Sequence, residues 1–142
     1  MEAIHHIGSF RAGSGAMLVL DPGLHLNHAL RIENVRKGEW TARAFTNEFF
    51  TTVLEASCDP DDASPAERFP LDVDCAMSAI CDPDSIEKDD DLRVKQCIDA
   101  TRDAQFGCVP YGAVFHYKED DTYPVQVYRD ANGVATKITI NE

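Results

Sequence analysis

The first 20 residues combine short apolar runs with small turn residues, a pattern typical of β-strands. Residues 4–13 have β-type character, Gly13-Ser14-Gly15 favours a turn, and residues 16–20 (AMLVL) form a continuous apolar run. A continuous apolar run of this length predicts a strand buried on both faces or lying at the centre of a sheet. We therefore expect two strands in this part of the chain.

The apolar run stops at Asp21-Pro22-Gly23, which could either end a strand or begin a binding site. Proline has no N–H to donate to a β-ladder, and glycine adopts the positive φ that tight turns require. We expect these three residues to form a turn at the end of a buried strand, and to be turn formers before they are site residues.

The next stretch predicts three more strands. Residues 28–35 and 39–46 alternate between apolar and polar positions around a connection that contains Gly38, which predicts a β-hairpin. Residues 48–57 are rich in aromatic and β-branched side chains and predict a further strand.

The middle of the chain changes character, because four of the seven prolines fall between residues 60 and 83 among many acids. We expect short regular structure there. A period-two apolar pattern nevertheless predicts one strand, at a sheet edge. Its apolar positions are Leu71, Val73, Cys75 and Met77.

The period then changes and predicts one amphipathic helix over about residues 86–105. Acidic residues at its start and Arg102 near its end complement the helix dipole, and Gly107 is positioned to stop it. Its expected apolar positions are Ile86, Leu92, Cys97, Ile98 and Ala104.

The C-terminal third alternates most regularly. Runs at 111–118, 122–129 and 134–140, separated by turn residues, predict a three-stranded antiparallel meander. Pro124 fits only an edge strand or the start of a strand.

These elements predict an α+β fold. We expect a mostly antiparallel, strongly twisted sheet, open or partly closed in the manner of a sandwich, with one helix packed on one face. The 142 residues suffice for one domain, 1–142, with an acidic, Pro-rich insert at about 55–91.

Charge is concentrated in that insert. Residues 55–91 hold 13 acids and two bases, a net charge of −11, whereas the rest of the chain holds 12 acids and 11 bases. Such a segment repels phosphate backbones and attracts basic proteins, so we expect no nucleic-acid partner. The alternative is that these acids serve only solubility, as a solvated loop.

The chain shows no apolar run of membrane-spanning length. The early run 16–20 is too short for the core of a signal peptide, and we expect a cytoplasmic location without membrane binding. The five cysteines are odd in number and widely spaced, which agrees with reduced thiols rather than a disulfide framework.

Two segments share a recognisable layout. The early SGAMLVLDPG has a small-residue turn, an apolar strand and an Asp-Pro stop, and the late FGCVPYGAVFHYKEDDTYPVQVYRDANGVATKITI has a Tyr-Pro-Val strand, an Asp-x-x-Gly turn and a last β-run. This layout, over roughly the first 50 and last 35 residues, resembles small bacterial and phage β-rich domains of the DUF4241 type. In that family Cys often follows the Asp-Pro and the late stretch holds Gly-Asp-Gly, where this chain has Gly23 and KEDDTYP. The resemblance implies a β-rich fold and no particular activity.

Metal and cofactor chemistry has little support in the motifs. His25 and His28 form an H-x-x-H pair, but there is no C-x-x-C, and this spacing places two strand residues on opposite faces. The further ligands open to such a pair are His5, His6, Cys58, Cys75 and Cys81. The clustered carboxylates suit Ca²⁺ but lack the D-x-D-x-D-G loop. We expect no dedicated metal site and no cofactor.

One catalytic alternative stays open. Cys108 and His116 would form a thiolate–imidazole pair if the fold brought them within hydrogen-bond reach, with the acids at 119–121 nearby. That arrangement would suit a small hydrolase or a metal-dependent enzyme.

The favoured hypothesis is a non-enzymatic, acidic binding protein of the immunity, inhibitor or anti-defence type, which engages a basic protein partner through its middle segment. The expected partner-binding residues are Asp59, Asp61, Asp62, Asp72, Asp74, Asp89, Asp90 and Asp91.

Overall fold

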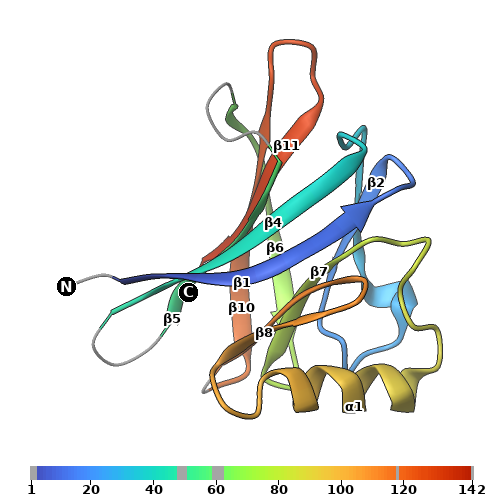
Figure 1. The fold of residues 1–142 in the computed structure, drawn as a ribbon, viewed down its shortest axis with the longest axis vertical. Coiled ribbons are helices and arrows are strands. Elements are labelled where there is room, and N and C mark those ends of the chain that lie inside the picture. The colour runs from blue at the N-terminus through green and yellow to red at the C-terminus, as the bar shows by residue number, and fades with distance from the viewer. Residues whose placement is uncertain (1–2, 48–50, 59–62, 118, 142) are drawn as a thin grey trace.

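A computed structural model describes residues 3–47, 51–58, 63–117 and 119–141. It is built almost entirely of antiparallel strands, with one α-helix and one 3-10 turn (Figure 1). The elements are β1 (Ala3–Ala12), β2 (Ala16–Leu20), η1 (Leu26–His28), β3 (Leu30–Glu33), β4 (Gly38–Thr46), β5 (Thr51–Ser57), β6 (Ser64–Val73), β7 (Met77–Cys81), α1 (Asp90–Ala100), β8 (Phe106–Val109), β9 (Gly112–His116), β10 (Asp121–Arg129) and β11 (Ala135–Asn141).

The strands form two open sheets. The larger has the order β1-β4-β5-β11-β10-β6, and the smaller has the order β3-β2-β7-β9-β8. One apolar cluster, which includes Trp40, Phe115 and Ile138, draws side chains from both sheets and lies between them. A second cluster, which includes Met77 and Cys97, joins the smaller sheet to α1. The fold is α+β, as the sequence predicts, with two packed sheets and one helix on the outer face of the smaller one.

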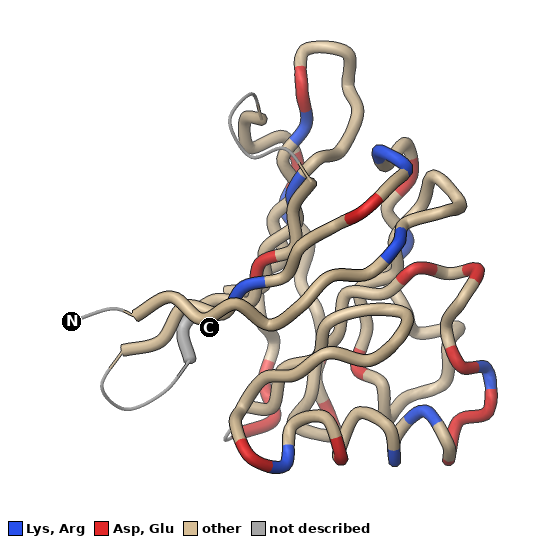
Figure 2. The backbone as a smooth tube through the Cα atoms, in the orientation of Figure 1, with Lys and Arg blue, Asp and Glu red and all other residues tan. Residues whose placement is uncertain are grey.

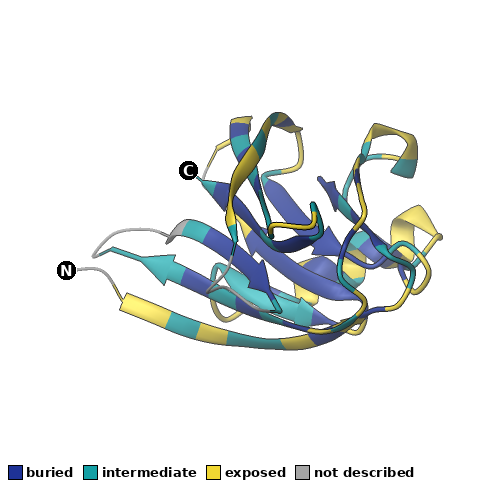
Figure 3. Cartoon of the chain, turned by 90° about the horizontal axis from the view of Figure 1, so that it is seen from above, coloured by how far each residue is buried: buried dark blue, intermediate teal, exposed yellow. Residues whose placement is uncertain are grey.

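The two sheets explain the fully apolar strands. Side chains of β2 enter both clusters, Val19 facing the larger sheet and Leu20 facing the helix layer. The strand lies second in its sheet, which confirms the prediction of a strand buried on both faces. Figure 3 shows the buried strands of the two sheets, while much of the outer half of β1 is exposed.

Two predicted strand pairings are wrong. The runs expected to form a hairpin around Gly38 become β3 and β4, which belong to different sheets: β3 pairs with β2, and β4 pairs with β1 and β5. The expected C-terminal meander is likewise divided, because β9 joins the smaller sheet, while β10 and β11 form a hairpin in the larger one. A short connection predicts proximity of two strands, whereas here the chain uses it to cross between layers.

The acidic middle segment forms strands of both sheets. β6 is ten residues long and is the edge of the larger sheet, so the prediction of short structure is wrong and that of an edge strand is confirmed. The predicted strand does not run on to Met77: the chain turns at Asp74-Cys75-Ala76, where Ala76 has a φ of 55°, and β7 enters the middle of the smaller sheet.

Pro124 lies on an internal strand rather than on an edge. It pairs with Pro70 of β6, and the pairing of β10 with β11 begins only at Val125. Two prolines can face each other across a β-ladder without losing a hydrogen bond only where the nitrogen of each points away from the other strand. Pro124 is therefore tolerated because its nitrogen faces the β11 side at a position that β11 does not pair.

The helix is shorter than predicted, and of its predicted apolar positions it buries Cys97 but not Leu92 or Ile98. It spans Asp90–Ala100 and ends at Thr101, so Gly107 does not stop it. Gly107 lies instead in β8, where a Cβ would fall 2.0 Å from the carbonyl oxygen of Ala100, so it permits close packing of α1. Leu92 and Ile98, expected in the core, are 44% and 48% exposed.

Arg93 takes the buried place on the helix and is fully enclosed. Its guanidinium donates to the backbone carbonyls of Pro22, Glu87 and Leu24, at 3.2, 2.9 and 2.9 Å. It also donates to the half-exposed carboxylate of Asp90 at 2.6 Å. Arg93 thus ties the helix to the turn that follows β2.

Replacing Arg93 by methionine should destabilise the protein by about 3 kcal/mol, because three buried or part-buried hydrogen bonds to backbone carbonyl groups lose their charged donor. Urea unfolding would measure the change. The matched control, Lys95→Met on the exposed side of the same helix, should change the unfolding free energy by no more than about 0.5 kcal/mol. Equal effects of the two substitutions would contradict the role given to Arg93.

Candidate active surface at the edge of β6

Three hollows surround the second half of the edge strand β6, and together they form the candidate functional site. Neighbouring hollows have lining residues in common: each of Pro70, Asp72, Asp74 and Thr122 lines two of the three. The strand projects alternate side chains to its two faces, so that Leu71 and Val73 enter the core while Asp72 faces outward. Adjacent hollows therefore have different chemistry.

The first hollow is acidic. It has a volume of about 310 Å³ and joins the end of β6 to the start of β10, two segments far apart in sequence. Its lining residues are Asp72, Val73, Asp74, Asp120, Asp121 and Thr122, and no described base is among them. The structure thus brings two of the predicted partner-binding residues, Asp72 and Asp74, together with two of the acids expected near the alternative catalytic site.

Hydrogen bonds orient some of these carboxylates and leave others unpaired. Asp72 accepts from the Thr122 hydroxyl at 2.7 Å, and Asp120 accepts from the backbone N–H of Ala76 at 2.8 Å. Within the described ranges, the Asp74 carboxylate has no hydrogen-bond or ion-pair partner. Negative charge at this end of the molecule is therefore only partly used by the fold.

The second hollow is a cleft of about 500 Å³ between β6 and the connection from β2 to β3. It is more enclosed than the other two, and leucine side chains from both sheets line it. The lining residues are Leu24, His28, Leu30, Pro70, Leu71, Asp72 and Asp74. The presence of three leucines beside the two carboxylates distinguishes this cleft from the acidic hollow next to it.

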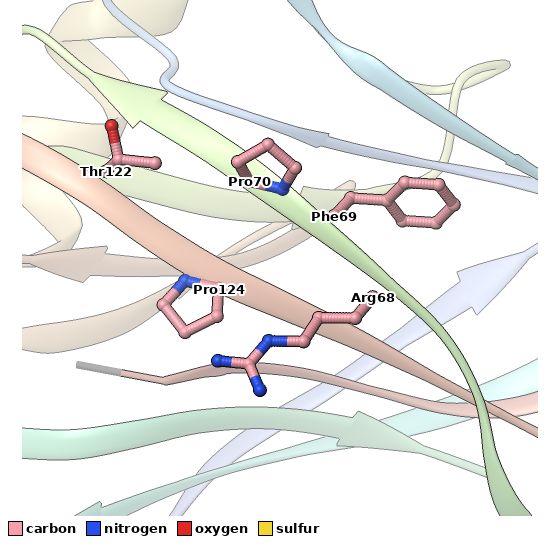
Figure 4. A pocket seen from close by; sticks show the side chains of 5 residues that line it. All are labelled: Arg68, Phe69, Pro70, Thr122 and Pro124. Atoms are coloured by element: carbon pink, nitrogen blue, oxygen red, sulfur yellow. The ribbon is translucent and has the colours of Figure 1, made fainter.

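The third hollow, of about 310 Å³, lies on the outer face of the larger sheet. The side chain of Arg68 extends from β6 towards Pro124 on the neighbouring strand (Figure 4). Phe69, Pro70 and Thr122 complete the lining. This is the basic and apolar end of the surface, next to the acidic end.

Asp21 holds the loop that carries Asp74. Its buried carboxylate accepts from the N–H groups of Asp74 and Cys75 at 2.8 and 2.7 Å, and from that of Gly23 at 2.9 Å. Gly23 does not adopt the positive φ expected of it; it is needed because a Cβ there would fall 2.3 Å from the Cys75 sulfur. Asp21-Pro22-Gly23 is a turn that ends a buried strand, as predicted, and it also fixes one side of the cleft.

The remaining predicted partner-binding residues lie elsewhere. Asp89 caps α1 by accepting from the N–H of Leu92 at 2.9 Å, Asp90 pairs with Arg93, and Asp91 is exposed. Figure 2 shows acidic residues along the segment that leads into α1. Asp59, Asp61 and Asp62 lie outside the described residues.

The structure does not bring Cys108 and His116 together. Cys108 pairs with Ala113 across β8 and β9, and His116 follows Ala113 by three residues, so the two side chains are on opposite faces of the sheet. The Cys108 thiol contacts the carbonyl oxygen of Gly112 at 3.3 Å, and burial raises its pKa. A nucleophilic cysteine requires the opposite shift.

Metal ligands do not gather in the part of the chain that the structure describes, where no three His, Cys, Asp or Glu side chains could hold an ion. His25 and His28 both lie exposed around η1, and the His25 ring accepts from the N–H of Asn27. The five cysteines are all free thiols, of which Cys81 and Cys97 are buried.

Sequence patterns indicated the acids of this surface but not its apolar side. Leu24 and Leu30 flank a connection that looked like the approach to a hairpin, and nothing local placed them against β6. The one available signal was the Asp-Pro-Gly turn, which marks where the chain reverses beside the cleft.

Comparisons with known protein families, with curated proteins and with solved structures found no match for this chain. Among the described residues, no helix has the length and apolar character needed to cross a bilayer.

Asp21→Asn should destabilise the protein by about 2 kcal/mol, because an amide nitrogen cannot accept the N–H groups that the carboxylate accepts. Hydrogen exchange of the Asp74 and Cys75 amides should accelerate relative to amides in β11. Unchanged protection at these two amides would show that the loop does not depend on Asp21.

Cys108 should react slowly with iodoacetamide at neutral pH, because its raised pKa leaves little thiolate there. The rate should increase as the pH rises above about 9, which is the direction expected when the thiolate forms only above a raised pKa. Peptide mapping by mass spectrometry, with glutathione as the reference thiol, measures this. A rate above that of glutathione would restore the catalytic alternative.

Proposed function

We propose that this protein is a non-enzymatic, acidic cytoplasmic binding protein of the immunity, inhibitor or anti-defence type, and that it engages a basic protein partner through its acidic middle segment. The observation that carries the proposal is the acidic hollow at the end of β6. Carboxylates from two distant parts of the chain border it, and no described base neutralises them.

Electrostatics supports this choice of partner. The formal net charge of the chain is −12, of which −11 belongs to residues 55–91. Such a concentration of one sign accelerates encounter with a basic surface and disfavours phosphate backbones. The effect acts over about one Debye length, roughly 10 Å at 0.1 M salt, so the interaction should weaken as salt rises.

The position of the acids supports binding rather than solubility alone. Asp72 lies on an edge strand, and Asp74 lies in a loop fixed by the buried carboxylate of Asp21. Side chains on a fixed backbone lose less conformational freedom on binding than those of a mobile loop. The acids at the start of α1 are partly used within the helix, by capping and by pairing with Arg93.

A pull-down from host lysate with matched charge variants tests the proposal. The site variant carries Asp72→Asn, Asp74→Asn and Asp121→Asn. The control variant carries Glu33→Gln, Glu39→Gln and Asp103→Asn, which remove the same charge at exposed positions outside both the hollow and residues 55–91. The captured basic protein should be identified by mass spectrometry and its affinity then measured by calorimetry with the purified partner.

The site variant should bind that partner at least about tenfold more weakly than the control variant, because it loses close charge pairs rather than net charge alone. Raising salt from about 0.05 to 0.5 M should release the partner from the unchanged protein. If both variants weaken binding equally, net charge rather than the acidic hollow determines the affinity, and the proposed interface is wrong. Capture that does not depend on salt would also contradict the acidic interface.

A further inference from the structure

We propose that the cleft between β6 and the β2–β3 connection is an anchor site for a lysine side chain of the partner. The inference rests on the proposed function and names the group that enters the surface. The cleft has about 500 Å³ of space, and its lining combines three leucines with two carboxylates. A lysine side chain has the same two parts, an aliphatic stem and a terminal charge.

The three leucines of the cleft match the aliphatic stem of lysine. Leu24 and Leu30 line it from the smaller sheet's side, and Leu71 lines it from β6. Leu24 and Leu30 are only half-buried, so apolar surface remains open to an incoming group, while Leu71 is buried. Each methylene group that leaves water for such a surface adds to the affinity.

The two carboxylates of the cleft match the positive charge of the lysine ammonium group. Asp72 and Asp74 line the cleft as well as the acidic hollow, so a terminal ammonium would meet carboxylates on leaving the apolar part. The Asp74 carboxylate has no partner among the described residues, and Asp72 has one hydrogen bond, through a single oxygen. Among the described residues, no lysine or arginine lines the cleft.

The walls of the cleft are fixed before any partner arrives. Arg93 holds the carbonyl of Leu24, and Asp21 holds the N–H of Asp74, so one buried side chain orders each wall. Pro70 stiffens the β6 side. A preformed cavity avoids the cost of ordering its walls, which favours binding of a single anchoring side chain.

Small probes test the anchor directly. n-Butylammonium reproduces the lysine side chain, methylammonium has the charge without the stem, and n-butanol has the stem without the charge. Each would be titrated into the full-length protein at equal ionic strength, with the methyl signals of Leu24, Leu30 and Leu71 followed by NMR. Saturable shifts at these methyl groups locate the binding.

n-Butylammonium should bind about tenfold more tightly than methylammonium, because three more methylene groups are buried, at a fraction of their full transfer value. It should bind about threefold more tightly than n-butanol, the value of a partly exposed ion pair. Equal affinity of the two ammonium ions, or shifts away from these leucines, would overturn the proposal.

Two variants separate the anchor from general charge attraction. His28→Trp places a bulky ring at the exposed border of the cleft and should weaken n-butylammonium at least about fivefold, because it occupies the space of the stem. Asn27→Trp, exposed on the same turn but not lining the cleft, is the control and should leave the affinity unchanged. Asp72→Asn with Asp74→Asn should reduce n-butylammonium to the affinity of n-butanol.

The same variants keep the two proposals distinguishable. His28→Trp retains every carboxylate, so the proposed acidic interface would survive it in part. If the site variant loses the partner while His28→Trp binds it as tightly as the unchanged protein, the lysine anchor is wrong and the acidic interface stands. If neither loses the partner, the acidic interface is wrong as well.

Discussion

The fold depends on one turn, at which two buried charged side chains are satisfied by backbone groups. The Asp21 carboxylate accepts three N–H groups, and the Arg93 guanidinium donates to two carbonyl groups of the same turn and to that of Glu87 before the helix. Buried charges are tolerated only when hydrogen bonds replace those lost from water. The end of β2, the approach to β7 and the helix are therefore fixed relative to one another, and the cleft beside β6 takes its shape from them.

Local patterns predicted most of the strands, because alternation and turn residues depend on near neighbours. They predicted the β10–β11 hairpin, the buried strand β2 and the turn at Asp21. They failed where the pairing of a strand, or the buried face of the helix, depends on residues of the other layer. β3 and β4 are joined by a short connection yet enter different sheets, and the helix buries Arg93 rather than Leu92 because the carbonyl groups that need a donor belong to a distant turn.

The candidate site divides in the same way. Its acids could be predicted because charge accumulates visibly along residues 55–91, and Asp72 and Asp74 do line the surface. Its apolar side could not, because Leu24 and Leu30 meet β6 only once both sheets are in place. The meeting of Asp120 and Asp121 with Asp74 has the same origin, since β6 and β10 pair across about 50 residues of chain.

The pair of prolines at the middle of the β6–β10 ladder has a consequence for the molecule in solution. Pro70 offers no N–H at the free border of the larger sheet, where an uninterrupted strand would invite another chain to add to it. A protein that leaves a strand edge exposed in this way risks polymerising into extended fibrils. The proline at this position, together with the mutual repulsion of copies that each carry a formal charge of −12, keeps the border accessible at high concentration without that risk.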